Sequence, residues 1–177
     1  CKLFTRIFEE EFVDSDELAQ ILEEKSLYWN DDLAYSLTWC CKTFKSFAGG
    51  ASWSLLPLYQ SEMIKGEGVE SDKFFVRKLL QASFAGYEKY SAMIAESVTG
   101  WEKERLFSTD VALIVMGLAE ASSFPTIPVK VTINEYVEIS KFYGTQKSRS
   151  FVNGLLDRLV QSMVNEGKIV KEGKGLM

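Results

Sequence analysis

The sequence predicts an all-α protein, and three observations support this fold class. Apolar residues recur at spacings of three and four along most of the chain, which is typical of amphipathic helices. Charged residues make up 25% of the composition and are spread between these apolar positions. The chain has only 3 prolines, which argues against the many turns of a β-sandwich. With 177 residues, it is long enough for one domain or two small packed subdomains.

Residues 1–71 are predicted to form an N-terminal helical part. A first helix over residues 2–13 carries an apolar stripe of Leu, Phe and Ile side chains. Residues 14–17 cap a second helix, and Asn30 is predicted to cap a long third helix that ends at Gly49 and Gly50. Residues 51–71 are expected to be a loop region with a turn around residues 65–68.

Residues 72–166 are predicted to form a C-terminal helical bundle. Asp72 opens a helix, Gly86 is expected to interrupt it, and a further helix follows to about Val98. The segment 110–121 is apolar nearly all round, which indicates a central, buried helix capped by Ser108 or Thr109. The loop 124–128 contains two prolines that prevent this helix from continuing.

Two short helices joined by a polar elbow follow that loop. Thr132 is expected to cap the first, with Glu135 completing a capping box three residues later. Gly144 is expected to supply the left-handed residue at which this helix stops. Ser148 is expected to cap the second helix, whose apolar stripe begins at Phe151. Residues 167–177 are predicted to be a frayed tail.

Several function classes are disfavoured by what the sequence lacks. There is no histidine, so histidine-dependent general bases, triads and metal sites are excluded. No Cys-x-x-Cys pair offers a zinc site, and the acidic pairs are explained by helix caps or solvated faces, although a carboxylate catalytic pair stays open. We therefore expect a protein that is not an enzyme and that carries no metal or cofactor.

The cysteines and the hydropathy pattern point to a reduced compartment. Cys40 and Cys41 are adjacent, which disfavours a disulfide between them, and Cys1 is terminal. No run approaches the ~18 apolar residues that span a membrane, and no signal peptide is visible. A cytoplasmic protein with no membrane contact is the simplest expectation.

Charge is distributed unevenly along the chain. Residues 1–123 hold 12 basic and 20 acidic residues, whereas residues 124–177 hold 8 basic and 5 acidic ones. A pI near 5.0 is not that of a general polyanion binder. The basic final third indicates one local cationic patch, unless these are ordinary solvated lysines.

The residue pattern of the elbow region resembles that of the NusB transcription antitermination family. The resemblance is carried by Thr-Ile-Asn-Glu-x-Val-Glu-Ile-x-Lys-x-Tyr-Gly from Thr132 and by Ser-x-x-Phe-Val-Asn-Gly-Leu-Leu-Asp from Ser148. It is strong over residues 101–165 and extends back to Asp72. It implies a fold of two packed small helical bundles with about seven helices.

The resemblance also implies a function in transcription. Such a protein binds the single-stranded boxA element of nascent RNA together with the small-subunit ribosomal protein that serves as NusE. The complex modulates pausing and termination by RNA polymerase. The acidic residues 1–123 are a credible surface for a basic ribosomal protein. Homodimerisation is possible and would cover the RNA face.

The candidate RNA contacts are Gln146, Lys147, Ser148, Arg149 and Phe151. The first four lie at the elbow and at a helix N-terminus, where free N–H groups suit a phosphate. Phe151 is interpreted either as a stacking platform for a base or as a core residue. The family commonly has an acidic residue just before this serine, so Lys147 is a departure that favours RNA electrostatically.

Three other motif residues have alternative interpretations. Asn134 and Glu135 could contact a partner, but satisfying the N–H groups of a capped helix is the favoured explanation. Gly154 costs ~1 kcal/mol within a helix, and close helix packing is favoured over a ligand approach as its cause.

Three readings of the chain as a whole stay open. The family's arginine-rich N-terminal segment has no counterpart here, since Arg6 is the only arginine in the first 76 residues, so an N-terminally truncated factor is expected. The same fold serves as the RNA-recognition domain of ribosomal RNA cytosine methyltransferases, in which a catalytic domain follows. A protein–protein module without RNA binding is the alternative of a different class.

Overall fold

The computed structural model describes residues 1–50, 72–98 and 106–176. These residues form seven α-helices with short π- and 3-10 segments, so the predicted all-α class is confirmed. The chain divides into two compact units, Cys1–Ser61 and Glu62–Met177, which are described separately below.

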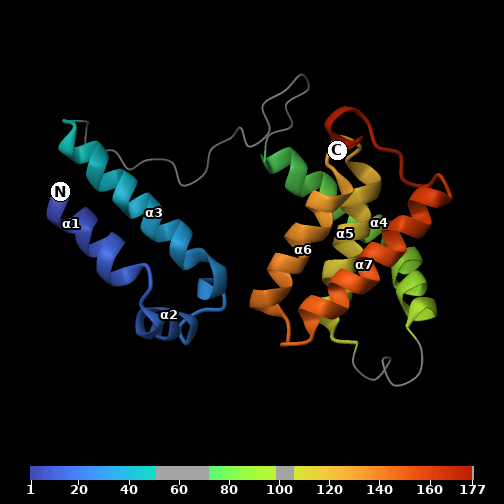
Figure 1. The fold of residues 1–177 in the computed structure, drawn as a ribbon, viewed down its shortest axis with the longest axis horizontal. Helices are drawn as coiled ribbons and strands as arrows, with labels where there is room; N and C mark the ends of the chain where they lie inside the picture. The colour runs from blue at the N-terminus through green and yellow to red at the C-terminus, as the bar shows by residue number, and fades with distance from the viewer. Residues whose placement is uncertain (51–71, 99–105, 177) are drawn as a thin grey trace. The chain divides into compact units, whose positions relative to one another are not determined.

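The first unit is built on aromatic contacts between α1 (Lys2–Ile7) and α3 (Trp29–Ala48) (Figure 1). The ring of Phe4 stacks on Phe44 with centroids 5.3 Å apart, and Phe8 lies 5.6 Å from the same ring. Phe8 belongs to η1 (Phe8–Phe12), a π-helical turn that continues α1. Leu37 and Trp39 of α3 are buried. Aromatic packing therefore joins the first and third predicted helices.

The helix starts in the first unit match the sequence prediction only in part. Ser15 caps α2 (Asp16–Glu23) by accepting a hydrogen bond from the backbone N–H of Leu18, as expected. In contrast, α3 begins at Trp29 with no side-chain cap, so Asn30 does not have the predicted capping position. A serine followed by two acidic residues is a stronger start signal than one asparagine after an aromatic connector.

The second unit is organised around α5 (Ser108–Ser123). This helix contacts α4 (Asp72–Ser97), α6 (Val129–Tyr143) and α7 (Ser148–Asn165) (Figure 1). Ile114, Leu118 and Ala119 are fully buried, as expected for a helix that is apolar nearly all round. The prediction of a central buried helix is confirmed, although no side chain caps its first turn.

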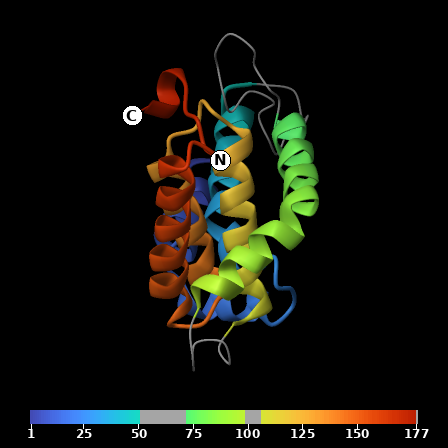
Figure 2. The same cartoon turned by 90° about the vertical axis from the view of Figure 1, so that its right-hand side faces the viewer.

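The helix α4 is continuous, and the predicted interruption at Gly86 is wrong. Its 26 residues run from Asp72 to Ser97, and Figure 2 shows the helix, in green, changing direction near its middle. A Cβ at Gly86 would lie 2.3 Å from the ring of Tyr90, one turn further along. Glycine is thus present to make room for a buried tyrosine, and the helix bends where the sequence suggested that it would end.

The helix α6 starts earlier than predicted, and this changes the role of Thr132. It begins at Val129 after Pro128, so Thr132 is inside the helix and is fully buried. Its hydroxyl donates to the Glu120 carboxylate at 2.7 Å, and the Tyr136 hydroxyl donates to the same carboxylate at 3.0 Å. The expected capping box is replaced by a buried polar contact between α5 and α6.

The final residues are ordered against the second unit, which differs from the predicted frayed tail. Ile169 is 4% exposed, and the backbone N–H of Glu172 donates to Pro125 O at 3.0 Å. Lys171 Nζ donates to Phe124 O at 3.0 Å, and burial lowers the pKa of Lys171. A short 3-10 turn, η3 (Gly173–Leu176), ends this segment. One buried apolar residue and two hydrogen bonds to the loop at residues 124–125 thus anchor a stretch that looks polar.

One sequence expectation, the loop over residues 51–71, lies outside the described residues. Over the ranges that are described, no helix has the length and hydropathy required to cross a bilayer.

We predict that Val115→Asp lowers the free energy of unfolding by at least about 4 kcal/mol, because it places an unpaired charge at a site that is 3% exposed. Ala112→Asp is the matched control, since Ala112 is exposed on the same helix. Urea denaturation followed by circular dichroism measures both variants. Equal stability of the two would contradict the central position of α5.

Candidate functional site

The elbow between α6 and α7 owes its tight turn to the small size of Gly144. Its backbone is extended, with φ −107° and ψ −174°, so the predicted left-handed stop is wrong. A Cβ at this position would lie 2.4 Å from Ser148 Cβ and 2.6 Å from Ser140 O. Glycine is required because the chain passes between two serines at close range, and this brings the two helices together.

The buried side chain of Ser148 stabilises the elbow through hydrogen bonds with Thr145. Its side chain is 1% exposed, and its hydroxyl accepts a hydrogen bond from the backbone N–H of Thr145 at 2.8 Å. The Thr145 hydroxyl lies 3.1 Å from the same oxygen. Ser148 is the first residue of α7 and does not cap it. Its predicted capping role is therefore wrong, and its burial leaves no surface for an RNA contact.

A buried carboxyl group lies beside this serine. Asp110, in the first turn of α5, is 2% exposed, and its Oδ1 has no hydrogen-bond partner among the described residues. Burial raises the pKa of the Asp110 carboxyl, and hydrogen bonding with Ser148 offsets part of this increase. The elbow thus rests on the N-terminal turn of the central helix.

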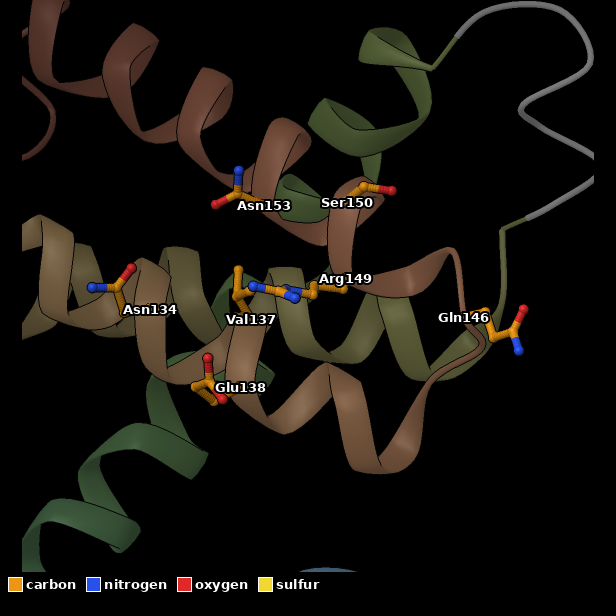
Figure 3. Close-up of a pocket in the computed structure, with 7 residues that line it drawn as sticks. All are labelled: Asn134, Val137, Glu138, Gln146, Arg149, Ser150 and Asn153. Atoms are coloured by element: carbon orange, nitrogen blue, oxygen red, sulfur yellow. The ribbon is translucent and has the colours of Figure 1, made fainter.

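A groove of about 460 Å³ opens on the outer side of the elbow, between α6 and α7 (Figure 3). Its lining residues come from both helices and from the elbow: Asn134, Val137, Glu138, Gln146, Arg149, Ser150 and Asn153. Figure 3 shows the Arg149 side chain extending from α7 toward Val137 of α6, with Gln146 at the far end. The groove therefore combines a guanidinium with one apolar lining residue.

The structure brings together only part of the predicted contact set. Gln146 and Arg149 both line the groove. Lys147 is exposed at the start of α7 but does not line it. Phe151 is half-buried and packs against the core, which favours the core interpretation over base stacking. Of the five predicted residues, three are thus available on the surface around the elbow.

Sequence reasoning missed the residues that α6 contributes to the groove. Asn134 is exposed on α6, five residues beyond its first residue, so it does not satisfy the helix N-terminus as expected. Glu138 forms an ion pair with Lys141 at the groove's edge. The signal that could have located Asn134 is its helical spacing from Val137 and Glu138, which places the three near one face.

The glycine of α7 also has a different explanation from the one expected. Gly154 follows the groove residue Asn153, and a Cβ there would meet no atom within 4 Å. Close packing against another helix therefore does not explain this glycine. The surface next to the groove is open at this point.

The side chains that line the groove are mainly polar, and one is cationic. The groove offers carboxamides, a guanidinium, a hydroxyl and one paired carboxylate. Over the described part of the chain, no group of three or more Cys, Asp or Glu side chains could hold a metal ion. The second unit is thus an all-helical module with a polar groove at a helix hairpin.

Comparison with known proteins identifies the family of this module. The profile described as the NusB family matches residues 56–161, which is more than half of the chain. The chain belongs to the NusB family. A search of solved structures gave no significant match.

Three curated relatives are each called transcription antitermination protein NusB. The one from Chloroherpeton thalassium is 34% identical over 105 residues, which are 59% of this chain and 50% of that protein. The one from Syntrophotalea carbinolica is 39% identical over 103 residues, 58% of this chain and 64% of that protein. The one from Alkaliphilus oremlandii is 30% identical over 110 residues, 60% of this chain and 80% of that protein. The chain thus spans half to four fifths of these relatives.

We predict that Asp110→Asn changes how stability depends on pH. Because the folded-state pKa of Asp110 lies above 3.8, the folded protein binds more protons than the unfolded chain between these two pKa values. The wild-type protein therefore loses stability as pH rises through this window, because the buried carboxyl loses its proton. The Asp110→Asn variant has no such loss, because asparagine stays neutral.

Urea denaturation of both proteins from pH 3 to pH 7 measures the difference, which should grow in favour of the variant as pH rises. The exposed Asp157→Asn serves as a control of the same chemistry on α7. A difference for Asp110→Asn that is flat with pH would contradict the buried position of this carboxyl.

Proposed function

We propose that this chain acts in transcription antitermination by binding single-stranded boxA-type RNA together with the small-subunit ribosomal protein NusE. The observation that carries the proposal is the NusB match over residues 56–161, which includes most of α4 to α7 and the groove. The names of the relatives support the role in transcription. The proposed action is binding and scaffolding in the cytoplasm, without a catalytic step.

The surface around the start of α7 supports the RNA contact. Lys147 and Arg149 flank Ser148 and are both exposed. No side chain caps α7, and the Ser148 N–H donates to Thr145 O. The following N–H groups of the first turn add a partial positive charge beside these two cations. A phosphate group is attracted to such a position. We place the RNA backbone here, with Gln146 beside it in the elbow.

The first unit supports a separate role towards the protein partner. Glu9, Glu10 and Glu11 are exposed within η1, and Asp14 and Asp16 follow. Glu9 and Glu10 form ion pairs with Lys45 and Arg6, respectively, so the negative charge of this surface is only partly compensated. Acidic side chains of this density attract a basic protein and raise the rate of its association. We assign this surface to the ribosomal protein, and the assembly then acts on the RNA polymerase elongation complex.

We predict that Lys147→Glu and Arg149→Glu each weaken RNA binding about tenfold or more without changing the fold, because each replaces a phosphate-attracting cation with a repelling anion. The matched control is Lys130→Glu, an exposed lysine near the opposite end of α6. Fluorescence anisotropy of a boxA-like RNA at several salt concentrations measures the effect. Each lost phosphate contact should reduce the slope of log K against log salt by ~0.7.

Measurements with and without the ribosomal protein complete this test. Binding that tightens when the partner is added would support cooperative assembly. Absence of RNA binding in every condition, with the ribosomal protein still bound, would favour a protein-interaction module. Unchanged affinity in both variants would remove the RNA contact from the elbow.

A further inference from the structure

The groove contains more recognition chemistry than a phosphate needs. Asn134 from α6, Gln146 from the elbow and Asn153 from α7 all present side-chain amides to it. None of these amides makes a hydrogen bond within the described residues, and both asparagines are exposed. Figure 3 shows Asn153 of α7 to one side of the Arg149 side chain and Asn134 of α6 beyond its tip. The groove therefore holds donors and acceptors that are not used by the fold.

Neutral amides and cations recognise different parts of a nucleic acid. A phosphate accepts hydrogen bonds only, and cationic donors are suited to it. An amide offers a donor and an acceptor side by side, which matches the edge of a base. Asparagine pairs in this way with adenine, and the plane of an arginine guanidinium can stack on the face of an unstacked base. Amides grouped beside an arginine are thus suited to a purine.

The groove has the form that an unstacked base requires. Val137 adds an apolar side chain to the lining that also contains Arg149, and the groove volume of about 460 Å³ is in the range of small-ligand sites. The open surface at Gly154 leaves room for the nucleotide's sugar and backbone beside Asn153. Single-stranded RNA is recognised through bases that are turned out in this manner.

We propose that the groove holds one unstacked purine of single-stranded RNA, with Asn134 and Asn153 reading the base edge and Arg149 lying against the base. This inference rests on the RNA binding proposed above. It adds recognition of one base to the proposed phosphate contacts. It assigns a binding role to residues of α6. The phosphate contacts proposed above involve only the elbow and α7. The asparagines then act in sequence discrimination, and Lys147 acts in general affinity.

The test is an abasic scan of a boxA-like RNA by fluorescence anisotropy. Each nucleotide in turn is replaced by an abasic residue, and the affinity of the full chain is measured for each RNA. We expect removal of one purine to weaken binding of the wild type about tenfold, as two amide contacts are lost. In the Asn134→Ala, Asn153→Ala double variant, the same removal should weaken binding no more than about twofold.

The double variant is expected to fold, since both residues are exposed and alanine has the higher helix propensity. Its salt slope should equal that of the wild type, because no charge is removed. Gln161→Ala removes an exposed amide from α7 outside the groove and should leave the abasic penalty unchanged.

Three outcomes overturn the proposal in different ways. Wild-type RNA binding with no purine-specific penalty, or with a penalty that persists in the double variant, overturns the base site while the proposed function stands. A double variant that binds RNA normally but loses the ribosomal protein makes the groove a protein site. No RNA binding by the wild type, with or without the ribosomal protein, removes the proposed function as well.

Discussion

Burial of most of α5 is the constraint on which the second unit depends. A helix with fully buried residues such as Ile114 and Leu118 needs neighbours on several faces, and α4, α6 and α7 supply them. Burial of these side chains contributes the main favourable free energy of the unit, at roughly 25 cal/mol per Å² of apolar surface. The positions of the outer helices follow from this requirement.

Specificity in this core comes from a few buried polar groups. Glu120 of α5 accepts hydrogen bonds from Thr132 and Tyr136, both on α6. Because an unsatisfied buried carboxylate is costly, rotation or sliding of α6 against α5 is opposed. Burial and the neighbouring Glu120 raise the pKa of the Tyr136 hydroxyl, so this donor keeps its proton at neutral pH. The hydrogen bonds to Glu120 thereby fix the orientation of α6, with the face that lines the groove on the side away from Glu120.

Sequence reasoning succeeded where one signal dominated. The apolar run of α5 and the serine cap of α2 each admit only one simple interpretation, and both are confirmed. The elbow was placed correctly between residues 143 and 148, because its polar composition interrupts two apolar stripes.

The failures concern residues whose role depends on distant neighbours. Gly86 and Gly144 are glycines because Tyr90 and Ser148 need space, and helix-breaking propensity does not contain that information. Thr132 looks like a cap but pairs with Glu120, twelve positions earlier in the chain. Asn134 was assigned to a helix end because the start of α6 was placed too late. In each case a tertiary contact outweighed a local preference.

The position of the groove on a helix hairpin has a consequence for how the site forms. Its lining residues span only positions 134 to 153, and the two helices that carry them are neighbours in the sequence. Contacts between such close neighbours need little loop-closure entropy and form quickly during folding. The lining of the groove therefore comes from one contiguous segment, whereas α5 supplies the contacts that orient the two helices of that segment.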